Sequence, residues 1–234
     1  MKAFSNDKYI ERNKKMGKTI TYVALGTLGV GFLISMFQPD LILWAYLALI
    51  VGFMLYQMSI SLINQWGTSP RPDEKVTKGL KGLSNDYKLY NFLTPIPQLL
   101  VGPSGIWILA AFHQRGDISY NEKKNKWVQK NVNMFLRIFS QESLGRPDPI
   151  VRSYEKDLQK FFSKEFPDLE LPEVKSALVF TSDLANVDAP NAKIPTLHAS
   201  KLKDFMRKQA KENPSDMETI QILQKMLIGE KKPK

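Results

Sequence analysis

The sequence predicts an α/β protein with a membrane anchor, in which a two-helix transmembrane hairpin precedes one α/β domain. Three observations support this prediction. Residues 19–37 and 41–63 are uncharged apolar runs, each about as long as the roughly 20 residues that cross a hydrocarbon core. Residues 64–234 are rich in charge. Their apolar residues alternate between short strand-like runs and helical periodicity, which is the pattern of an α/β domain.

The predicted hairpin occupies residues 19–63. Only Gln38, Pro39 and Asp40 separate its two runs, so the helices must be antiparallel and in contact. Neither run has the polar stripe that a helix of a soluble core would show. Small side chains on each run would let the backbones approach closely. The residues expected at this helix–helix contact are Thr27, Gly31, Ser35, Ala45, Ala48 and Gly52.

Basic residues flank the hairpin on both sides. Residues 1–18 form a basic N-terminal segment, and Arg71, Lys75, Lys78 and Lys81 follow the second run, whereas the connecting turn has no basic residue. By the positive-inside rule, both termini are expected in the cytoplasm. A cleaved signal peptide would have a shorter apolar part, followed by a mature domain rather than by a second apolar run.

Composition limits the chemistry. The chain has no cysteine and two histidines, which excludes disulfides, thiolate nucleophiles and thiolate metal sites. We expect no metal and no cofactor. The net charge is +10; removing the +4 of residues 1–18 and the −1 of Asp40 leaves +7 for residues 64–234. This excess would favour an anionic leaflet or nucleic acid, although interleaved acidic residues favour a role in solubility and topology.

The first part of the α/β domain follows a linker at residues 64–79. Apolar residues at steps of three or four predict a helix over residues 80–93. Residues 99–102 and 106–112 then predict two strands joined by a tight turn at Pro103-Ser104-Gly105. Both strands are almost continuously apolar, as expected at the centre of a covered sheet.

The second part of the domain has weaker patterns. Asp148, as an N-cap followed by Pro149, predicts a helix that runs to about Phe166. Residues 132–139 fit a strand and a helix equally well. The remaining elements are expected as strands at 117–120, 177–181 and 194–197, a polar turn at 121–126, and helices at 201–211 and 215–228. The domain is thus placed at residues 80–210, with a C-terminal helix and charged tail at 211–234.

Four segments carry a family resemblance. They are LLVGPSGIWIL with a tryptophan further on, DPIVRSYEKDLQKFF, VKSALVFTS and IPTLHASKLKDFM. In this order, over about Leu80 to Arg207, the chain resembles the NERD (nuclease-related) domain. The resemblance implies a restriction-endonuclease-like α/β fold with a mixed central sheet. It also implies a prokaryotic cell (inner) membrane as the location of the anchored protein.

Nucleases of that fold carry an acid at the start of the hairpin and Glu-x-Lys on the following strand. Period two places the glutamate and the lysine on one face of the strand, where the two carboxylates hold Mg²⁺ and the lysine orients the attacking water. In this chain the matching positions are Pro97, Ala110 and Phe112, none of which can bind a metal. The family's Asn-Pro…Gln helix is also altered, to Asp148, Pro149 and Arg152. The resemblance therefore implies a pseudoenzyme with no catalytic or metal-binding residues.

Other polar residues offer alternative sites. His113, Asp117 and Glu122 are the candidates for a relocated metal site, but they fit a solvated turn and a satisfied histidine better. His198 lacks a partner motif. Nucleic acid could instead bind without cleavage at a basic cluster around one tryptophan. This cluster consists of Lys123, Lys124, Lys126, Trp127 and Lys130, which also fit a solvated hairpin edge.

These observations predict a membrane-anchored, catalytically inactive protein that acts through protein–protein interaction, as a scaffold or accessory subunit of a membrane assembly. Its expected partners are the lipid bilayer and other membrane-protein subunits or further copies of itself. Membrane-tethered nucleic-acid binding is the alternative, and residual metal-dependent nuclease activity is less favoured. Two helices without an intramembrane charge give no indication of transport.

Overall fold

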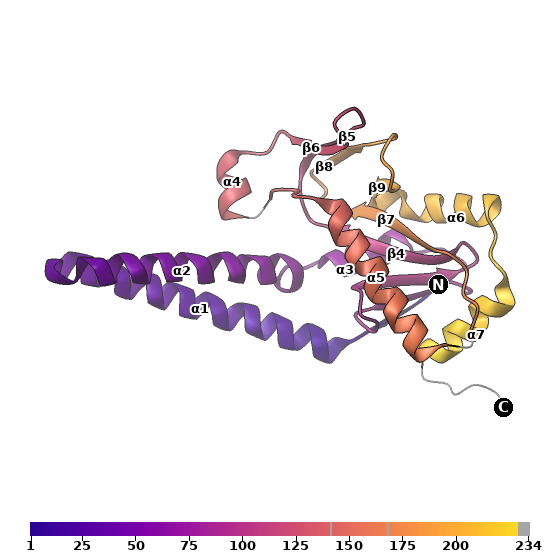
Figure 1. Ribbon diagram of the computed structural model, residues 1–234, viewed down its shortest axis with the longest axis horizontal. Helices are drawn as coiled ribbons and strands as arrows, with labels where there is room; N and C mark the ends of the chain where they lie inside the picture. The colour runs from indigo at the N-terminus through magenta and orange to yellow at the C-terminus, as the bar shows by residue number, and fades with distance from the viewer. Residues whose placement is uncertain (141, 168, 229–234) are drawn as a thin grey trace. The chain divides into compact units, whose positions relative to one another are not determined.

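The computed structural model describes residues 1–140, 142–167 and 169–228, which form two units (Figure 1). The hairpin unit consists of Asp7–Arg71 and Asn133–Glu142. The sheet unit consists of Met1–Asn6, Pro72–Val132 and Ser143–Lys234. The chain is thus a mixed α/β protein with two long apolar N-terminal helices, as the sequence predicts.

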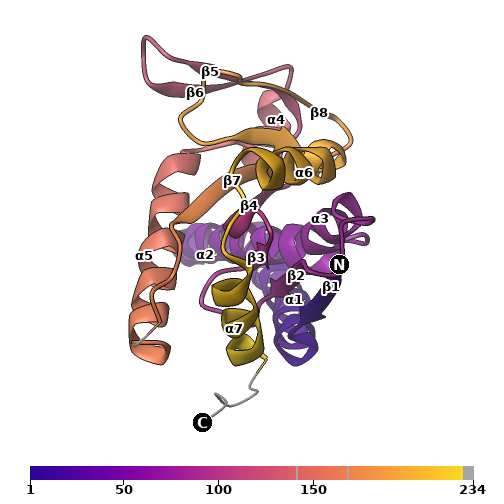
Figure 2. The same cartoon turned by 90° about the vertical axis from the view of Figure 1, so that its right-hand side faces the viewer.

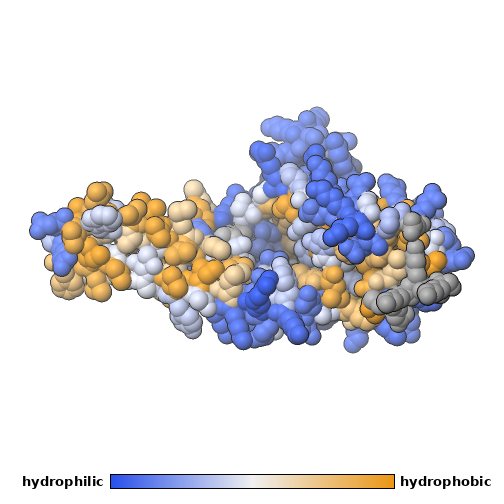
Figure 3. All heavy atoms as spheres, turned by 60° about the horizontal axis from the view of Figure 1, so that its bottom comes forward, coloured by the Kyte–Doolittle hydropathy of each residue, from blue (hydrophilic) through white to orange (hydrophobic). Residues whose placement is uncertain are grey.

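Two helices, α1 (Asp7–Phe37) and α2 (Ile42–Leu62), make up most of the hairpin unit. A 3₁₀ turn, η1 (Pro39–Leu41), joins them, and a π-helical turn, η2 (Ile63–Gly67), continues α2. By length and composition, both helices could cross a membrane, and only 11% of each apolar stretch is buried. Figure 3 shows apolar side chains gathered over these helices.

The N-terminal 18 residues do not form a separate segment. Residues Lys2–Ser5 form strand β1 of the sheet unit, and α1 already begins at Asp7. The helix extends through the basic residues because Lys, Arg and Glu are good helix formers, and Asp7 in the first turn suits the positive end of the helix dipole.

Small side chains form the contact between α1 and α2. A Cβ atom on Gly31 would lie 3.1 Å from the carbonyl oxygen of Ala45. One on Gly52 would lie 2.7 Å from Cγ of Leu28. The buried small residues recur at every seventh position, which is the period of a left-handed helix pair. They are Gly17, Ala24 and Gly31 on α1 and Ala45, Gly52 and Ser59 on α2.

The predicted contact residues Thr27 and Ser35 are not part of this buried series. The Thr27 hydroxyl donates to the carbonyl of Val23 at 2.8 Å, and that of Ser35 donates to Phe32 at 2.7 Å. Both therefore satisfy their hydrogen-bonding groups within their own helix. Thr21 lies closer to the partner helix, since its Oγ1 is 2.9 Å from Oγ of Ser59.

A mixed six-stranded sheet forms the centre of the sheet unit. Its order is β1-β2-β3-β4-β7-β9, with antiparallel pairs β2/β3 and β3/β4 and parallel pairs β1/β2, β4/β7 and β7/β9. The predicted hairpin is β3–β4, which turns through Gly105 at a φ of +100°, a conformation that favours glycine. The strands are β2 (Lys88–Asn91), β3 (Gln98–Gly102), β4 (Gly105–Phe112), β7 (Val174–Phe180) and β9 (Thr196–His198).

Helices cover both faces of this sheet (Figure 2). On one face, α3 (Pro72–Gly79) and α6 (Leu202–Glu212), which follows the 3₁₀ turn η3 (Ala199–Lys201), bury Val76, Leu202 and Met206. On the other, α5 (Pro147–Glu165) and α7 (Met217–Leu227) bury Leu158 and Ile220. Because both faces are covered, β3 and β4 are almost entirely apolar.

A second, three-stranded sheet has the order β6-β5-β8. Its strands are β5 (Gly116–Asn121), β6 (Lys126–Lys130) and β8 (Ala185–Asp188). It shares a third cluster of buried residues with the central sheet, in which Ile118 and Trp127 pack with Phe112 and Phe180. Of these strands, only β5 is predicted from the sequence; β6 and β8 are short and polar and therefore have no clear strand pattern.

The prediction of a helix over residues 80–93 is wrong. Leu80, Leu83, Tyr87 and Tyr90 are all buried, as the periodicity indicates. However, Gly82 has a φ of +92°, which ends the helical path, and the chain continues into β2. The helix lies instead at α3, within the stretch predicted as a linker at residues 64–79.

The structure also decides the element at residues 132–139 and corrects the start of the helix predicted at Asp148. The ambiguous residues 132–139 contain a helix, α4 (Met134–Phe139). Helix α5 begins at Pro147 with Arg146 as its N-cap, so Asp148 is not the capping residue. Asp148 lies in the first turn of α5, where its carboxylate accepts a hydrogen bond from Nε1 of Trp127 in β6. The charged tail predicted for residues 229–234 lies outside the described residues.

Candidate functional site

The positions that match the nuclease triad lie against a filled apolar core. Ala110 is 2% exposed and Phe112 is 7% exposed, and the Phe112 ring stacks on Phe180 with centroids 5.6 Å apart. Tyr154 packs against the same cluster, and burial raises the pKa of its phenol, so it stays neutral. This location offers apolar side chains where a metal site would need carboxylates.

The start of β3 is equally unsuited to hold a metal. Pro97 directly precedes the strand and has no ligand atom on its side chain. Gln98 lies one residue on and therefore faces the other side of the sheet. It is 1% exposed, and its Nε2 donates to Oδ1 of Asn91 at 3.3 Å. Within the described residues, no group of three or more His, Asp or Glu side chains could hold a metal ion.

The candidates for a relocated metal site do not converge. Oδ1 of Asp117 accepts a hydrogen bond from Asn186 at 3.2 Å, and its Oδ2 accepts one from Asn131. Both oxygens therefore tie strands and loops of the smaller sheet together. Glu122 is exposed in the turn before β6. His198 is held by Oγ of Ser200 at 2.8 Å and by the carbonyl of Ser182 at 3.1 Å.

A basic cavity lies where β6 meets the start of α5. Its volume is about 410 Å³. Of the predicted nucleic-acid-binding residues, Lys124, Lys126 and Trp127 line it, whereas Lys123 and Lys130 do not. The cationic side chains around it, all exposed, are Lys124, Lys126, Arg146, Arg152 and Lys193.

The aromatic residue of this cavity is structural rather than free for stacking. Trp127 is 7% exposed, and its Nε1 donates to Oδ2 of Asp148 at 2.8 Å. The edge of Tyr120 packs against its ring at a centroid distance of 5.1 Å. The indole therefore links the smaller sheet to the first turn of α5. A base could not stack on its faces without displacing these neighbours.

Electrostatics around the cavity are strongly positive. Five cations face it together with one carboxylate, that of Asp148, which already accepts the indole hydrogen bond. Within the described parts of the chain, none of the five cations is in an ion pair. Uncompensated like charges at one concave site raise the local concentration of anions. Sequence patterns point to Lys124, Lys126 and Arg152 but not to Arg146 and Lys193, because three segments that are distant in the sequence meet at this cavity.

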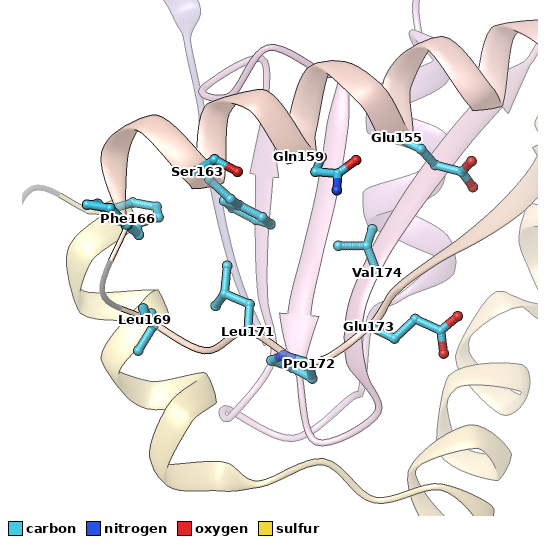
Figure 4. Close-up of a pocket in the computed structure, with 11 residues that line it drawn as sticks. Glu155, Gln159, Ser163, Phe166, Leu169, Leu171, Pro172, Glu173 and Val174 are labelled. Atoms are coloured by element: carbon cyan, nitrogen blue, oxygen red, sulfur yellow. The ribbon is translucent and has the colours of Figure 1, made fainter.

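A second cavity, of about 610 Å³, lies between α5 and the segment that leads into β7 (Figure 4). Its wall includes Leu171 and Val174, and Glu155 and Glu173 lie at one end. Glu155 accepts a hydrogen bond from Oγ of Ser176 at 2.7 Å, which ties α5 to β7. Two carboxylates without a third ligand do not make a metal site.

Comparisons of the chain with protein-family models, with curated proteins and with solved structures give no match.

Proposed function

We propose that this protein is a membrane-anchored, catalytically inactive nuclease-related protein that acts as a scaffold or accessory subunit of a membrane assembly. The observation that carries the proposal is the apolar filling around Ala110 and Phe112. A metal nuclease needs carboxylates there to hold the ion and activate water. A domain that keeps a covered sheet but has apolar residues at these positions retains its surfaces for binding.

The fold is consistent with the nuclease-related resemblance. The segments that carry the resemblance become the hairpin β3–β4, helix α5, strand β7, and strand β9 followed by α6. All belong to the sheet unit, and β3, β4, β7 and β9 share one sheet. A mixed central sheet is also what the resemblance implies. This order supports a restriction-endonuclease-like domain as the proposed fold.

The hairpin unit is proposed to anchor the protein. Its large apolar side chains are exposed, for example Leu43 at 76% and Trp44 at 62%. In water this surface would be unfavourable, whereas in a bilayer it is the expected one. Basic residues lie in residues 1–18, ahead of the first apolar stretch, and again after the second one. By the positive-inside rule they favour a cytoplasmic location for both termini. A prokaryotic cell membrane follows from the resemblance.

The decisive experiment is purification of the full chain from its native membrane in mild detergent, followed by mass measurement of the particle. The proposal expects stoichiometric partner subunits or a defined oligomer. As a control, α1 and α2 are replaced by an unrelated two-span hairpin, which separates partners of the hairpin from partners of the sheet unit. A monomer in both preparations would overturn the proposal.

A cleavage assay tests the inactive state directly. The full chain is incubated with DNA and RNA in Mg²⁺ or Mn²⁺, and no cleavage is expected. Metal-dependent cleavage that the substitution Asp117→Ala abolishes would show a relocated catalytic centre instead.

Polyanion binding at the basic cavity is the second candidate function. It is favoured by the five cations, which form no ion pair among the described residues. We expect nucleic acid to bind without cleavage, with an affinity that falls steeply with salt. The double variant Arg146→Gln/Arg152→Gln should weaken duplex binding and reduce the salt slope by about 2. The control Lys156→Gln/Lys160→Gln removes the same charge from exposed positions further along α5. Equal effects of both variants would exclude a role for the cavity.

A further inference from the structure

Helix α4 exposes bulky apolar side chains. Met134 is 74% exposed, Phe135 is 62% exposed and Ile138 is 44% exposed, although the helix has only six residues. Three such side chains on one short helix form a patch that is unfavourable in water and typical of an interaction surface.

Polar groups of α2 and its extension hold α4 in place. Nε2 of Gln57 donates to the carbonyl of Ile138 at 2.8 Å, and Nδ2 of Asn64 donates to that of Ser140 at 3.0 Å. The rings of Phe53 and Phe139 meet edge to face at 6.0 Å. The apolar patch of α4 is therefore continuous with the apolar surface of the hairpin unit.

The contact lies at one end of α2. Gln57 and Asn64 are about 10 Å apart along a helix, at 1.5 Å per residue. Just beyond them, Trp66 packs edge to face on Tyr9 at 5.5 Å, and the guanidinium of Arg12 lies 5.4 Å from the Tyr9 ring centre. Trp66 is buried, but Tyr9 is 38% exposed, and an exposed tyrosine ring next to a cation is typical of the membrane–water interface.

We propose that α4 inserts into the headgroup and upper acyl region of the bilayer beside α2, as a third membrane contact of the chain. This inference rests on the proposed membrane anchor. The last carbonyls of a helix have no intrahelical partner, and in a lipid environment they must be satisfied by protein groups. Gln57 and Asn64 supply those donors, and Oδ1 of Asn133 accepts the Phe135 N–H at 2.8 Å at the other end. The arrangement also gives Gln57, a polar residue within an apolar helix, a structural role.

The test uses the absence of cysteine from the chain. Single-cysteine variants of the full protein carry an environment-sensitive fluorophore at Phe135→Cys, at Leu47→Cys within α2, or at Leu184→Cys in the sheet unit. Leu184 is the matched control, because it is an apolar residue that is 66% exposed. The labelled proteins are placed in phosphatidylcholine vesicles, with nitroxide-bearing lipid or aqueous iodide as the quencher.

The inference expects blue-shifted emission and nitroxide quenching at positions 135 and 47, and iodide quenching at position 184. Iodide quenching at 135 with nitroxide quenching at 47 would overturn the inference and leave the anchor intact. Protection from both quenchers at 135 would also overturn it, because protein would then cover α4. Iodide quenching at both 135 and 47 would overturn the anchor itself.

Discussion

In the apolar stretches of α1 and α2, the buried positions are small, such as Ala24 and Gly52, whereas Leu43 is 76% exposed. In the sheet unit, many of the fully buried side chains are large, such as those of Tyr90 and Phe180. The two units therefore differ in the size of the side chains that they bury. The difference is what the proposed membrane anchor expects, because burial of large apolar side chains drives folding in water, whereas helices in lipid associate through small residues.

Polar side chains form hydrogen bonds between elements in both units, but the units differ in where their charged side chains lie. In the hairpin unit, hydroxyl groups bond within or between helices, as Thr21 and Ser59 do. In the sheet unit, polar side chains link separate elements, as Trp127 and Asp148 do. The apolar stretches of the hairpin unit, residues 19–37 and 41–63, have no charged side chain, whereas the sheet unit exposes many. This distribution is consistent with the proposed lipid around those stretches and water around the sheet unit.

The largest expected effect comes from adding a charge to the sheet core. Ala110→Glu should lower the free energy of unfolding by about 3–5 kcal/mol, because a buried carboxylate has no partner there. Burial raises the pKa of the new carboxyl, so its protonated form is favoured in the folded state. The loss of stability should therefore grow as pH rises above the carboxyl's ordinary range. Pulse proteolysis in detergent micelles would measure it.

The control for that experiment is Ala3→Glu, on the exposed face of β1. It should change stability little at any pH. If Ala110→Glu, combined with Phe112→Lys, gave a stable protein that cleaved DNA with Mg²⁺, the core would be an accessible site and the comparison of the two units would need revision.

A buried leucine of the sheet unit and an exposed leucine of the hairpin unit test whether the two units differ in the side chains that they bury. Leu158→Ala in α5 removes a fully buried side chain and should cost about 2–5 kcal/mol of stability. Leu43→Ala in α2 removes an exposed one and should stay within about 0.5 kcal/mol. Protease resistance of the full chain in bilayer nanodiscs reports both. Equal losses would mean that Leu43 packs against protein, not lipid.

Two glycines test the small-residue contact. Gly52→Leu should separate α1 from α2, at a cost of about 1–3 kcal/mol, because its new side chain meets Leu28. Gly26→Leu should have no such effect, since a Cβ there meets nothing within 4 Å. Disulfide formation in the Thr21→Cys/Ser59→Cys background measures helix contact, as the chain has no other cysteine. Equal crosslinking in both variants would contradict the observed packing.

The same glycines show what the sequence could and could not predict. Length and absence of charge were sufficient for two long apolar helices, and the residues Gly31, Ala45 and Gly52 were identified as small. A spacing of four residues from Gly31 also predicts Thr27 and Ser35 at the helix contact, but these two residues are not among the buried small residues. The period of seven, visible in Gly17, Ala24 and Gly31, carried the correct signal, because two packed helices repeat their contact every two turns.

In the sheet unit, continuous apolar runs predicted β3, β4 and β7, since buried strands have few alternatives. Strand β8 was missed because its residues are polar and its pairing with β5 is a property of the folded chain. The basic cavity was predicted only in part for the same reason. Arg146 and Lys193 join Lys126 there through tertiary structure, and no local pattern relates them.

The smallest expected effect concerns how helix ends are satisfied in the two units. Helix α2 has Leu41 as its N-cap and no side-chain cap, whereas Asp216 caps α7 by accepting from the N–H groups of Glu218 and Thr219 at 3.2 and 3.1 Å. The Thr219 hydroxyl, followed by these backbone groups, lowers the pKa of Asp216 below its ordinary 3.8. Because the pKa is lowered in the folded protein, the carboxylate stabilises the fold fully at pH values above its ordinary 3.8. This stabilisation is lost as the pH falls through the lowered pKa of the folded state.

Asp216→Ala should therefore speed hydrogen exchange of the first amides of α7 at neutral pH, and the difference from the unsubstituted protein should shrink in acid. Asp216→Asn is the matched control, because it keeps an acceptor but cannot titrate. Its exchange should resemble that of the unsubstituted protein at neutral pH and should not show the acid loss. If Asp216→Ala leaves these amides unchanged, α7 is held by its apolar contacts alone, through Ile220 and Leu223. The capped and uncapped helices of the two units would then be stabilised in the same way, by packing rather than by their ends.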